Sequence, residues 1–386
     1  MSLAYCTNVH PAESWEETFL VLKTDVLAVR DQLREKKMEL PESELGFAIG
    51  LRLSACAAEE LFEEEPLEEF ADWLEEENCH VFTINGFPYG AFHNTSVKEK
   101  VYLPDWTSRK RLDYTLNLCG IIATLCPEET GGSVSTLPGS FKEFAADEFP
   151  MFENLYACAD FLEQLAEESG KDLHLGLEPE PMGHFENLEE TLVFFQRFER
   201  WCEDEDLDPE ILYRRIGVNY DTCHFALEFE DCEKDLKAFE KAGIRISKIH
   251  LSNALSFDPS NPEALTALRA FEEPTYLHQV LLKEGETITR HRDLPEFFAS
   301  IDKSPTLTGE GRCHFHIPLY SEPTKPLRST RNHAADVLSY LKIHPEICRH
   351  LEIETYTWGV LPTNLQRPLT DQIVEEYRWV LERLAN

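Results

Sequence analysis

Acidic residues and a histidine stand where four apolar segments in the second half of the chain give way to polar residues. The segments end at Glu178, Asp221, His250 and Glu354, and Asp221 opens the tetrapeptide Asp-Thr-Cys-His. Three carboxylates brought together without a cation repel one another in a poorly solvated pocket, and a divalent ion relieves that repulsion. Carboxylate oxygens and imidazole nitrogens are ligands for Mn²⁺, Zn²⁺, Mg²⁺ or Co²⁺. The four residues are therefore predicted to hold one divalent metal ion.

Further polar residues are candidates for catalysis and for substrate binding. Glu178, Glu354 and His224 are the candidates for proton transfer. The residues expected to contact substrate are His10, Asn85, His93, His316 and Trp358. His314 and His316 form an H-x-H pair, which on a strand would put both imidazoles on one face, as metal ligands or at a surface. The sequence leaves the roles of these two histidines open.

The elements that position these residues are strand-like and helix-like segments that alternate along the chain. The predicted strands are eight short apolar or alternating runs, at residues 3–7, 45–53, 80–84, 133–137, 173–178, 216–220, 246–251 and 351–355. Amphipathic segments lie between them, and the first opens with the capping pattern Ser14-Trp-Glu-Glu17. This alternation predicts a (β/α)₈ TIM barrel, formed by residues 1–386 as a single domain, with a small hairpin inserted near residues 276–292.

In such a barrel the reactive groups lie at the C-terminal ends of the strands, where the candidates fall. Structural explanations remain open beside the functional ones. The carboxylates could close the barrel through salt bridges, and the histidines could be core residues with satisfied hydrogen bonds. Glu180 and Glu352 share strand faces with the chosen ligands, two residues away. They are the alternative ligands if the register is shifted.

Composition limits the partners. The chain has 72 Asp and Glu against 36 Lys and Arg, a formal net charge of −36, which disfavours nucleic acid as a partner. No run of about eighteen apolar residues and no secretory pattern at the first residues is found, so membrane insertion is not expected. The eleven cysteines are scattered and fit reduced thiols better than disulfides. The protein is expected to be cytoplasmic and to act on a small molecule.

At its strand ends the chain resembles the xylose isomerase-like barrel superfamily, which includes sugar isomerases, ketose 3-epimerases and the endonuclease IV type of DNA-repair enzyme. Glu178 and Glu354 match the first and last metal-binding Glu of that family, Asp221 with its following Thr-Cys-His matches the D-T-x-H motif, and His250 matches the histidine of the seventh strand. His314-Phe-His316 is similar to the D-x-H pair of the endonuclease branch. The His in place of Asp departs from a full trinuclear zinc site.

More narrowly, several stretches look like the EboE-type metabolite traffic proteins. They are residues 5–11, 85–93, 101–106, 177–181 and 352–358. This likeness implies the processing or traffic of a small metabolite precursor.

Three functions fit these residues. In a metal-dependent isomerase or epimerase of a sugar or related metabolite, Glu178 or Glu354 moves a proton beside a substrate carbonyl. In a multinuclear zinc hydrolase of the endonuclease IV type, His93, His314 and His316 help to hold two or three ions. In a non-catalytic binding protein, the pocket carries the metabolite without turnover. The four matched ligands suffice for the first function, which is the favoured one.

Overall fold

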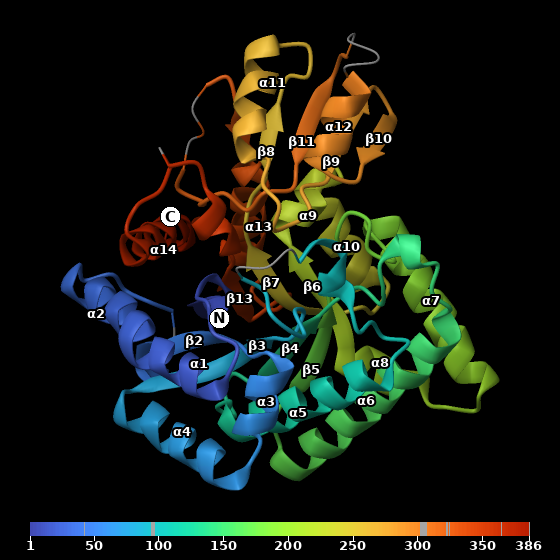
Figure 1. Cartoon of the computed structure of the whole chain (residues 1–386). Helices are drawn as coiled ribbons and strands as arrows, with labels where there is room; N and C mark the ends of the chain where they lie inside the picture. Colours follow the sequence, from blue (N-terminus) through green and yellow to red (C-terminus); the bar gives the residue numbers. More distant parts are fainter. Residues whose placement is uncertain are drawn as a thin grey trace.

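The computed structural model describes residues 1–41, 43–93, 97–301, 307–321, 323, 325–363 and 365–385. Eight parallel strands form its central sheet (Figure 1). They are β1 (Ser2–Tyr5), β2 (Phe47–Arg52), β3 (Cys79–Asn85), β4 (Gly132–Thr136), β5 (Leu173–Leu177), β6 (Ile216–Asp221), β7 (Ile246–Leu251) and β13 (His350–Ile353). They follow the order β1-β13-β7-β6-β5-β4-β3-β2, and a parallel bridge between Cys6 and Gly50 links the two outer strands. The predicted barrel is confirmed.

Burial explains why these segments form strands. Every residue of the eight strands is buried. Strands covered on both faces are near-continuous apolar runs, because helices shield one face and the barrel interior the other. Polar residues within these strands and at their ends, such as Ser133, Asn219 and Asp221, are therefore exceptions to the pattern, and their burial needs partners.

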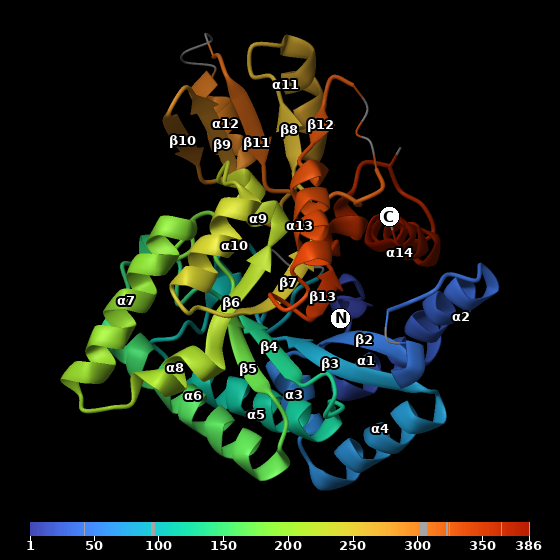
Figure 2. The same cartoon turned by 180° about the vertical axis from the view of Figure 1, so that it is seen from behind.

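Helices pack around the outside of the barrel (Figure 2). They are α1 (Trp15–Val21), α2 (Leu27–Glu35), α3 (Ala55–Leu61), α4 (Glu64–Glu76), α5 (Arg109–Leu125), α6 (Glu148–Ser169), α7 (Leu188–Asp204), α8 (Pro209–Arg215), α9 (Thr222–Leu227), α10 (Cys232–Lys241), α13 (Arg331–Ile343) and α14 (Leu369–Ala385). The capping box of Ser14 and Glu17 begins α1 as predicted. None of the described helices is long and apolar enough to cross a membrane.

A second, antiparallel sheet leaves the barrel just after β7. Its strands, in the order β10-β9-β11-β8-β12, are β8 (Leu255–Phe257), β9 (Val280–Glu284), β10 (Thr287–His291), β11 (Glu310–Cys313) and β12 (Arg328–Ser329), and it carries α11 (Pro262–Leu268) and α12 (Leu294–Ile301). The predicted hairpin is the pair β9 and β10. The insertion is larger than expected and has an apolar core of its own, which includes Phe257, Leu282 and Phe297.

Candidate metal centre

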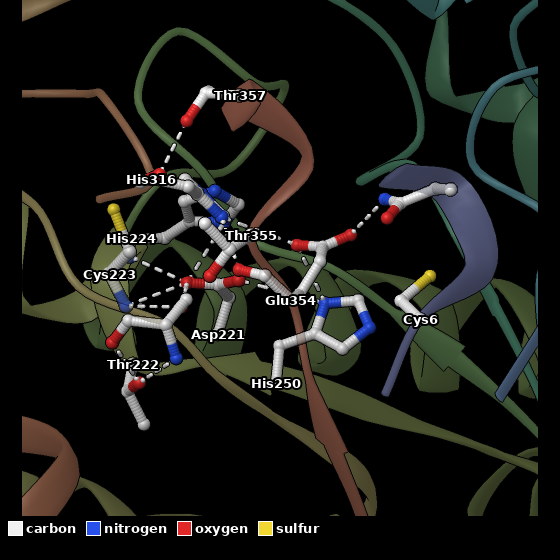
Figure 3. Close-up of polar contacts among 12 residues, drawn as sticks. Cys6, Asp221, Thr222, Cys223, His224, His250, His316, Glu354, Thr355 and Thr357 are labelled. Carbon is white, nitrogen blue, oxygen red and sulfur yellow. Dashed lines mark hydrogen bonds and ion pairs between the residues drawn. The ribbon is translucent and has the colours of Figure 1, made fainter. Parts of the chain in front are cut away.

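Glu178, Asp221, His250 and Glu354 converge at the C-terminal ends of β5, β6, β7 and β13. Asp221 pairs with His250 across β6 and β7, and Glu352 pairs with His250 across β7 and β13, so the strand ends are level. One ligand atom from each of the four residues lies within 4.8 Å of the others, and all four residues are buried. Figure 3 shows Asp221, His250 and Glu354 turned toward one another. The sequence thus identified four side chains that the fold brings together.

Asp221 is fixed by the start of a helix. It is the N-cap of α9, and its Oδ1 accepts hydrogen bonds from the backbone N–H groups of Cys223 at 2.7 Å and His224 at 3.0 Å, and from the hydroxyl of Ser252 at 2.7 Å (Figure 3). Its Oδ2 has no hydrogen-bond partner within the described part of the chain. A buried carboxylate oxygen without a partner is costly, and a metal ion at the centre would satisfy it.

Glu354 is held in the same one-sided way. Its Oε1 accepts hydrogen bonds from the side-chain amides of Asn8 at 2.8 Å and Asn85 at 3.0 Å. Its Oε2 therefore faces His250, whose Nδ1 lies 3.3 Å away. Asn85, predicted to contact substrate, lines the pocket and also positions Glu354. Asn8 was not predicted, and its only signal in the sequence is an amide just after the first strand.

Glu178 and His250 complete the pattern. Glu178 Oε2 accepts a hydrogen bond from the amide of Asn219 at 2.8 Å, and its Oε1 lies 3.0 Å from His250 Nδ1. The other nitrogen of His250, Nε2, donates to Glu352 at 2.8 Å. Because Nε2 carries that proton, Nδ1 is the nitrogen available to a metal ion.

Glu352 lies one layer below the centre and is not part of the four-residue group. Its Oε2 also accepts from the ammonium of Lys248 at 2.6 Å, and both side chains are buried. Gly50 makes room for it, because a Cβ at that position would lie 2.1 Å from Glu352 Oε1. The structure therefore places Glu354, and not Glu352, in the group of candidate ligands.

The carboxylates of the group repel one another. Burial, together with the carboxylates of Glu178 and Asp221, raises the pKa of Glu354 to about 8, against the opposing effect of His250. Burial alone would lower the pKa of His250, but the carboxylates of Glu354 and Glu178 raise it well above its usual value. Excess negative charge of this kind is what a divalent ion neutralises. The four residues fit such an ion.

A second group of imidazoles lies beside the first. Nε2 of His314 is 3.2 Å from Nε2 of His224 and 3.2 Å from Nε2 of His316. Each Nδ1 faces an acceptor, namely the carbonyl of Pro179 for His224, the Gln279 amide oxygen for His314 and the Glu354 carbonyl for His316. Carbonyl oxygens only accept, so the protons are on Nδ1 and the Nε2 lone pairs face one another.

The neutral state of His314 and His316 follows from their burial. Burial lowers the pKa of His316 to about 4 and that of His314 well below its usual value, with nearby imidazoles adding to the effect on His314. Neutral imidazoles with facing lone pairs are suited to a cation such as Zn²⁺. The structure therefore brings His224, a predicted proton-transfer residue, together with His314 and His316, whose roles the sequence left open.

A pocket of about 580 Å³, counting the part open to solvent, lies above both groups. Its polar lining consists of Asn8, Asn85, Lys98, Glu178, Glu180, His224, Gln279, His314 and Glu354, and its apolar and aromatic lining of Phe87, Pro88, Phe92, Val97, Val101, Tyr102, Tyr276, Leu277 and Tyr356. Glu180, the other alternative ligand, is buried in this wall. Burial and the carboxylates of Glu178, Asp221 and Glu354 raise the pKa of Glu180 well above its usual value, while Tyr102 opposes the shift.

Four residues predicted to bind substrate, namely His10, His93, His316 and Trp358, are not part of this lining. His10 is buried with its Nε2 3.0 Å from the Tyr5 hydroxyl, and His93 Nε2 lies 2.6 Å from the Asn8 carbonyl oxygen. The indole N–H of Trp358 donates to the carbonyl of Arg367. Substrate contact by His10, His93 and Trp358 stays a prediction. His316 lies in the imidazole group beneath the pocket.

No protein-family model matches this chain, and no curated protein matches it. The chain is similar to several solved structures. They include an IolI protein with a bound zinc atom (12% identity, 100% of this chain and 98% of that chain, TM-score 0.45), a probable 3-DHS dehydratase AsbF of Bacillus anthracis (12%, 100% and 99%, 0.43) and a D-tagatose 3-epimerase-like protein (11%, 100% and 100%, 0.46). At such identities the chemistry of this chain rests on its own residues.

Proposed function

We propose that this protein is a divalent-metal-dependent isomerase or epimerase that acts on a sugar or a related small metabolite with a carbonyl beside a hydroxyl. The observation that carries the proposal is the one-sided anchoring of the four ligands. Each of Glu178, Asp221, His250 and Glu354 has one polar atom held by the protein and the other turned to a common centre. Side chains positioned in this way need little rearrangement when an ion binds, so the free-energy cost of binding is small.

The residues of the chain supply the proton transfer. When bound, a divalent ion supplies polarisation of the substrate oxygens, which acidifies the C–H beside the carbonyl. Glu178 Oε1 and Glu354 Oε2 both lie near His250 Nδ1, and one of these two carboxylates removes that proton while the other returns a proton to the substrate. His224, whose Nδ1 is 3.8 Å from Glu178 Oε1, lines the pocket where it can contact a substrate oxygen.

Deuterium exchange tests this function without knowledge of the natural substrate. Metal-loaded protein is incubated in D₂O with dihydroxyacetone, D-fructose and 2-hydroxy-1-phenylethanone, and deuterium at the carbon beside the carbonyl is followed by proton NMR. We expect exchange in at least one probe, lost in Glu178→Gln or Glu354→Gln. Absence of exchange in all three, with metal bound, would contradict the proposal.

The second candidate is a multinuclear zinc hydrolase of phosphoesters, which the facing nitrogens of His224, His314 and His316 favour. Metal analysis separates the two functions. For the isomerase we expect about one ion per chain, retained in His224→Ala and in His316→Ala, both with lower activity. Two or three ions in the wild type, falling by one or more in either variant, together with cleavage of bis(4-nitrophenyl) phosphate, would favour the hydrolase.

A further inference from the structure

The upper wall of the pocket is apolar, although its floor is polar. The floor consists of the carboxylates and imidazoles described above, whereas the wall presents Phe87, Phe92, Val97, Val101, Leu277 and Tyr356. Phe92 and Val97 pack with Tyr276 in a small cluster, with Val101 and Tyr356 packed against it, and Val101 also packs against the main core of the barrel. The wall comes from the loop after β3, the segment before β9 and the turn after β13, so three distant parts of the chain combine to make it.

Two polar groups in this wall, those of Gln279 and Tyr276, already make hydrogen bonds within the protein. The amide oxygen of Gln279 accepts a hydrogen bond from His314 Nδ1, and its amide nitrogen donates one to the carbonyl of Pro181. The hydroxyl of Tyr276 donates to the Phe92 carbonyl at 3.2 Å. A polyol, with a hydroxyl on each carbon, would press several of them against apolar side chains, and each unpaired hydroxyl costs binding free energy.

Charge argues against an anionic ligand. Lys98 is the one cationic residue among the described lining residues, and its ammonium lies 2.5 Å from the carboxylate of Asp293. Glu178, Glu180 and Glu354 face the same space. A divalent ion at the centre would have its two positive charges balanced by the carboxylates of Glu178, Asp221 and Glu354, so a phosphorylated or carboxylated ligand would meet no unpaired cationic side chain in the described lining.

Three buried polar atoms of the lining make no hydrogen bond of ordinary geometry within the described ranges, namely Oδ1 of Asn8, Oε1 of Glu180 and the hydroxyl of Tyr102. The Tyr102 hydroxyl lies near the Glu180 carboxyl and opposes the rise in its pKa that burial causes. Buried polar atoms of this kind are ordinarily satisfied, so they mark a place where a ligand can hydrogen-bond. A ligand with one further polar group near its reactive end would satisfy them.

We infer that the substrate is a neutral hydroxy-carbonyl compound whose body is an aromatic or other apolar ring, bound with its polar end on the floor and its ring against Phe87, Phe92, Val97 and Val101. The inference rests on the proposed function for the chemistry at the polar end. It changes the substrate class from a polyol to an amphipathic metabolite. Aromatic walls of this kind bind rings through apolar burial and edge or stacked contacts.

Matched probes test this substrate class. 2-Hydroxy-1-phenylethanone, dihydroxyacetone and D-fructose share the same hydroxy-ketone group and differ in the rest of the molecule. Calorimetric titration of the metal-loaded full chain should show the phenyl probe binding about 10-fold or more tightly than the other two, because only its ring buries apolar surface. Equal or tighter binding of D-fructose or dihydroxyacetone would overturn the inference.

A double variant with side chains of similar volume tests whether the apolar wall causes the tighter binding of the phenyl probe. Val97→Thr with Val101→Thr adds two hydroxyls to the wall with little change of volume, and we expect the phenyl probe to bind several-fold more weakly while dihydroxyacetone is unaffected. The control is Val193→Thr on the surface of α7, where the side chain is 39% exposed. Equal loss for both probes, or no loss for either, would contradict a ring site at Val97 and Val101.

Metal titration on the same samples distinguishes failure of the proposed function from failure of this inference. If the protein binds no divalent ion, both the proposed function and this inference are wrong. If it binds the ion but does not bind the phenyl probe more tightly than the other two probes, the inference alone is wrong.

Discussion

Glu352 accepts a hydrogen bond from His250 Nε2 at 2.8 Å, on the opposite side of the ring from the nitrogen that faces Glu178 and Glu354. The same Glu352 oxygen accepts from buried Lys248. This chain of contacts fixes which nitrogen of His250 is free for a metal ion. The effect of Glu352 on metal binding can therefore be measured although it touches no ligand other than His250.

We predict that Glu352→Gln lowers the affinity for the divalent ion by about 10- to 100-fold, because a neutral amide orients His250 less firmly and leaves Lys248 unneutralised. Calorimetric metal titration measures the affinity, and circular dichroism checks the fold. Glu346→Gln is the matched control, since that side chain is 65% exposed. Unchanged affinity in folded Glu352→Gln would contradict a positioning role.

Asn8→Ala and Asn85→Ala each remove one of the two amides that hold Glu354 Oε1. We expect each variant to keep its metal ion but to slow deuterium exchange by roughly 10- to 100-fold, because Glu354 loses its orientation. Exchange rates and metal content are measured on the same preparation. Asn117→Ala on α5 should behave as wild type. Loss of the ion in both variants would instead show that the amides support binding.

Removal of the metal ion should destabilise the protein. An ion at a thousand times its dissociation constant adds about 4 kcal/mol to the folded state, and for a chain of this size that corresponds to a shift of several degrees in Tm. Thermal unfolding with and without a chelator measures the shift. Asp221→Asn should show little chelator effect. A Tm that does not respond to metal in the wild type would argue against the centre.

The acidic charge predicts no binding of duplex DNA at physiological salt. Seventy-two acidic residues against thirty-six basic ones produce a repulsive field, and the described pocket lining holds one cationic residue, Lys98. A gel-shift titration with a short duplex measures this. Sub-micromolar binding at that salt would revive the repair-enzyme function.

Glu376 gives a pH dependence of stability that is independent of the metal centre. Burial raises its pKa to about 7, although the hydroxyl of Thr355 and the backbone N–H of Leu319 donate to it and oppose the shift. The folded chain then holds a proton that the unfolded chain loses at lower pH. The contribution of Glu376 is therefore present below the unfolded pKa and is lost as the pH rises through about 7.

Glu376→Gln should remove that loss. Its free energy of unfolding, measured by urea denaturation at pH 5 and pH 8, should gain on the wild type as the pH rises, by up to about 1.4 kcal/mol per pH unit below pH 7. Gln keeps the oxygen that accepts from Thr355 and Leu319. A constant difference between variant and wild type would show that Glu376 is ionised in the folded protein.

The barrel and its four-ligand group were predictable because both depend on local signals. The barrel strands are short apolar or alternating runs, and Glu178, Asp221, His250 and Glu354 each fall where a run ends. The inserted sheet was predicted only as a hairpin, since β8, β11 and β12 have three, four and two residues and show little periodicity. Helix α9 was missed because it begins directly at the end of β6.

The partners of the ligands were not predictable from spacing. Asn8 and Glu354 are 346 residues apart, and only closure of the barrel between the first and last strands brings them together. His224 and His314 are 90 residues apart, and the path of the inserted segment brings them together. Predicting such pairs requires the register of the strands and the path of the inserted segment.

One segment of the chain contributes both to the imidazole group and to the upper wall. Leu277, His314 and His316 all lie on the connection between β7 and β13, whereas the four-ligand group stands at the ends of barrel strands. A change in this connection can therefore leave the four-ligand group in place. A shorter connection would remove His314, His316 and Leu277 together, so the replacement of a single loop would change both the imidazoles beside the four-ligand group and one side of the pocket wall.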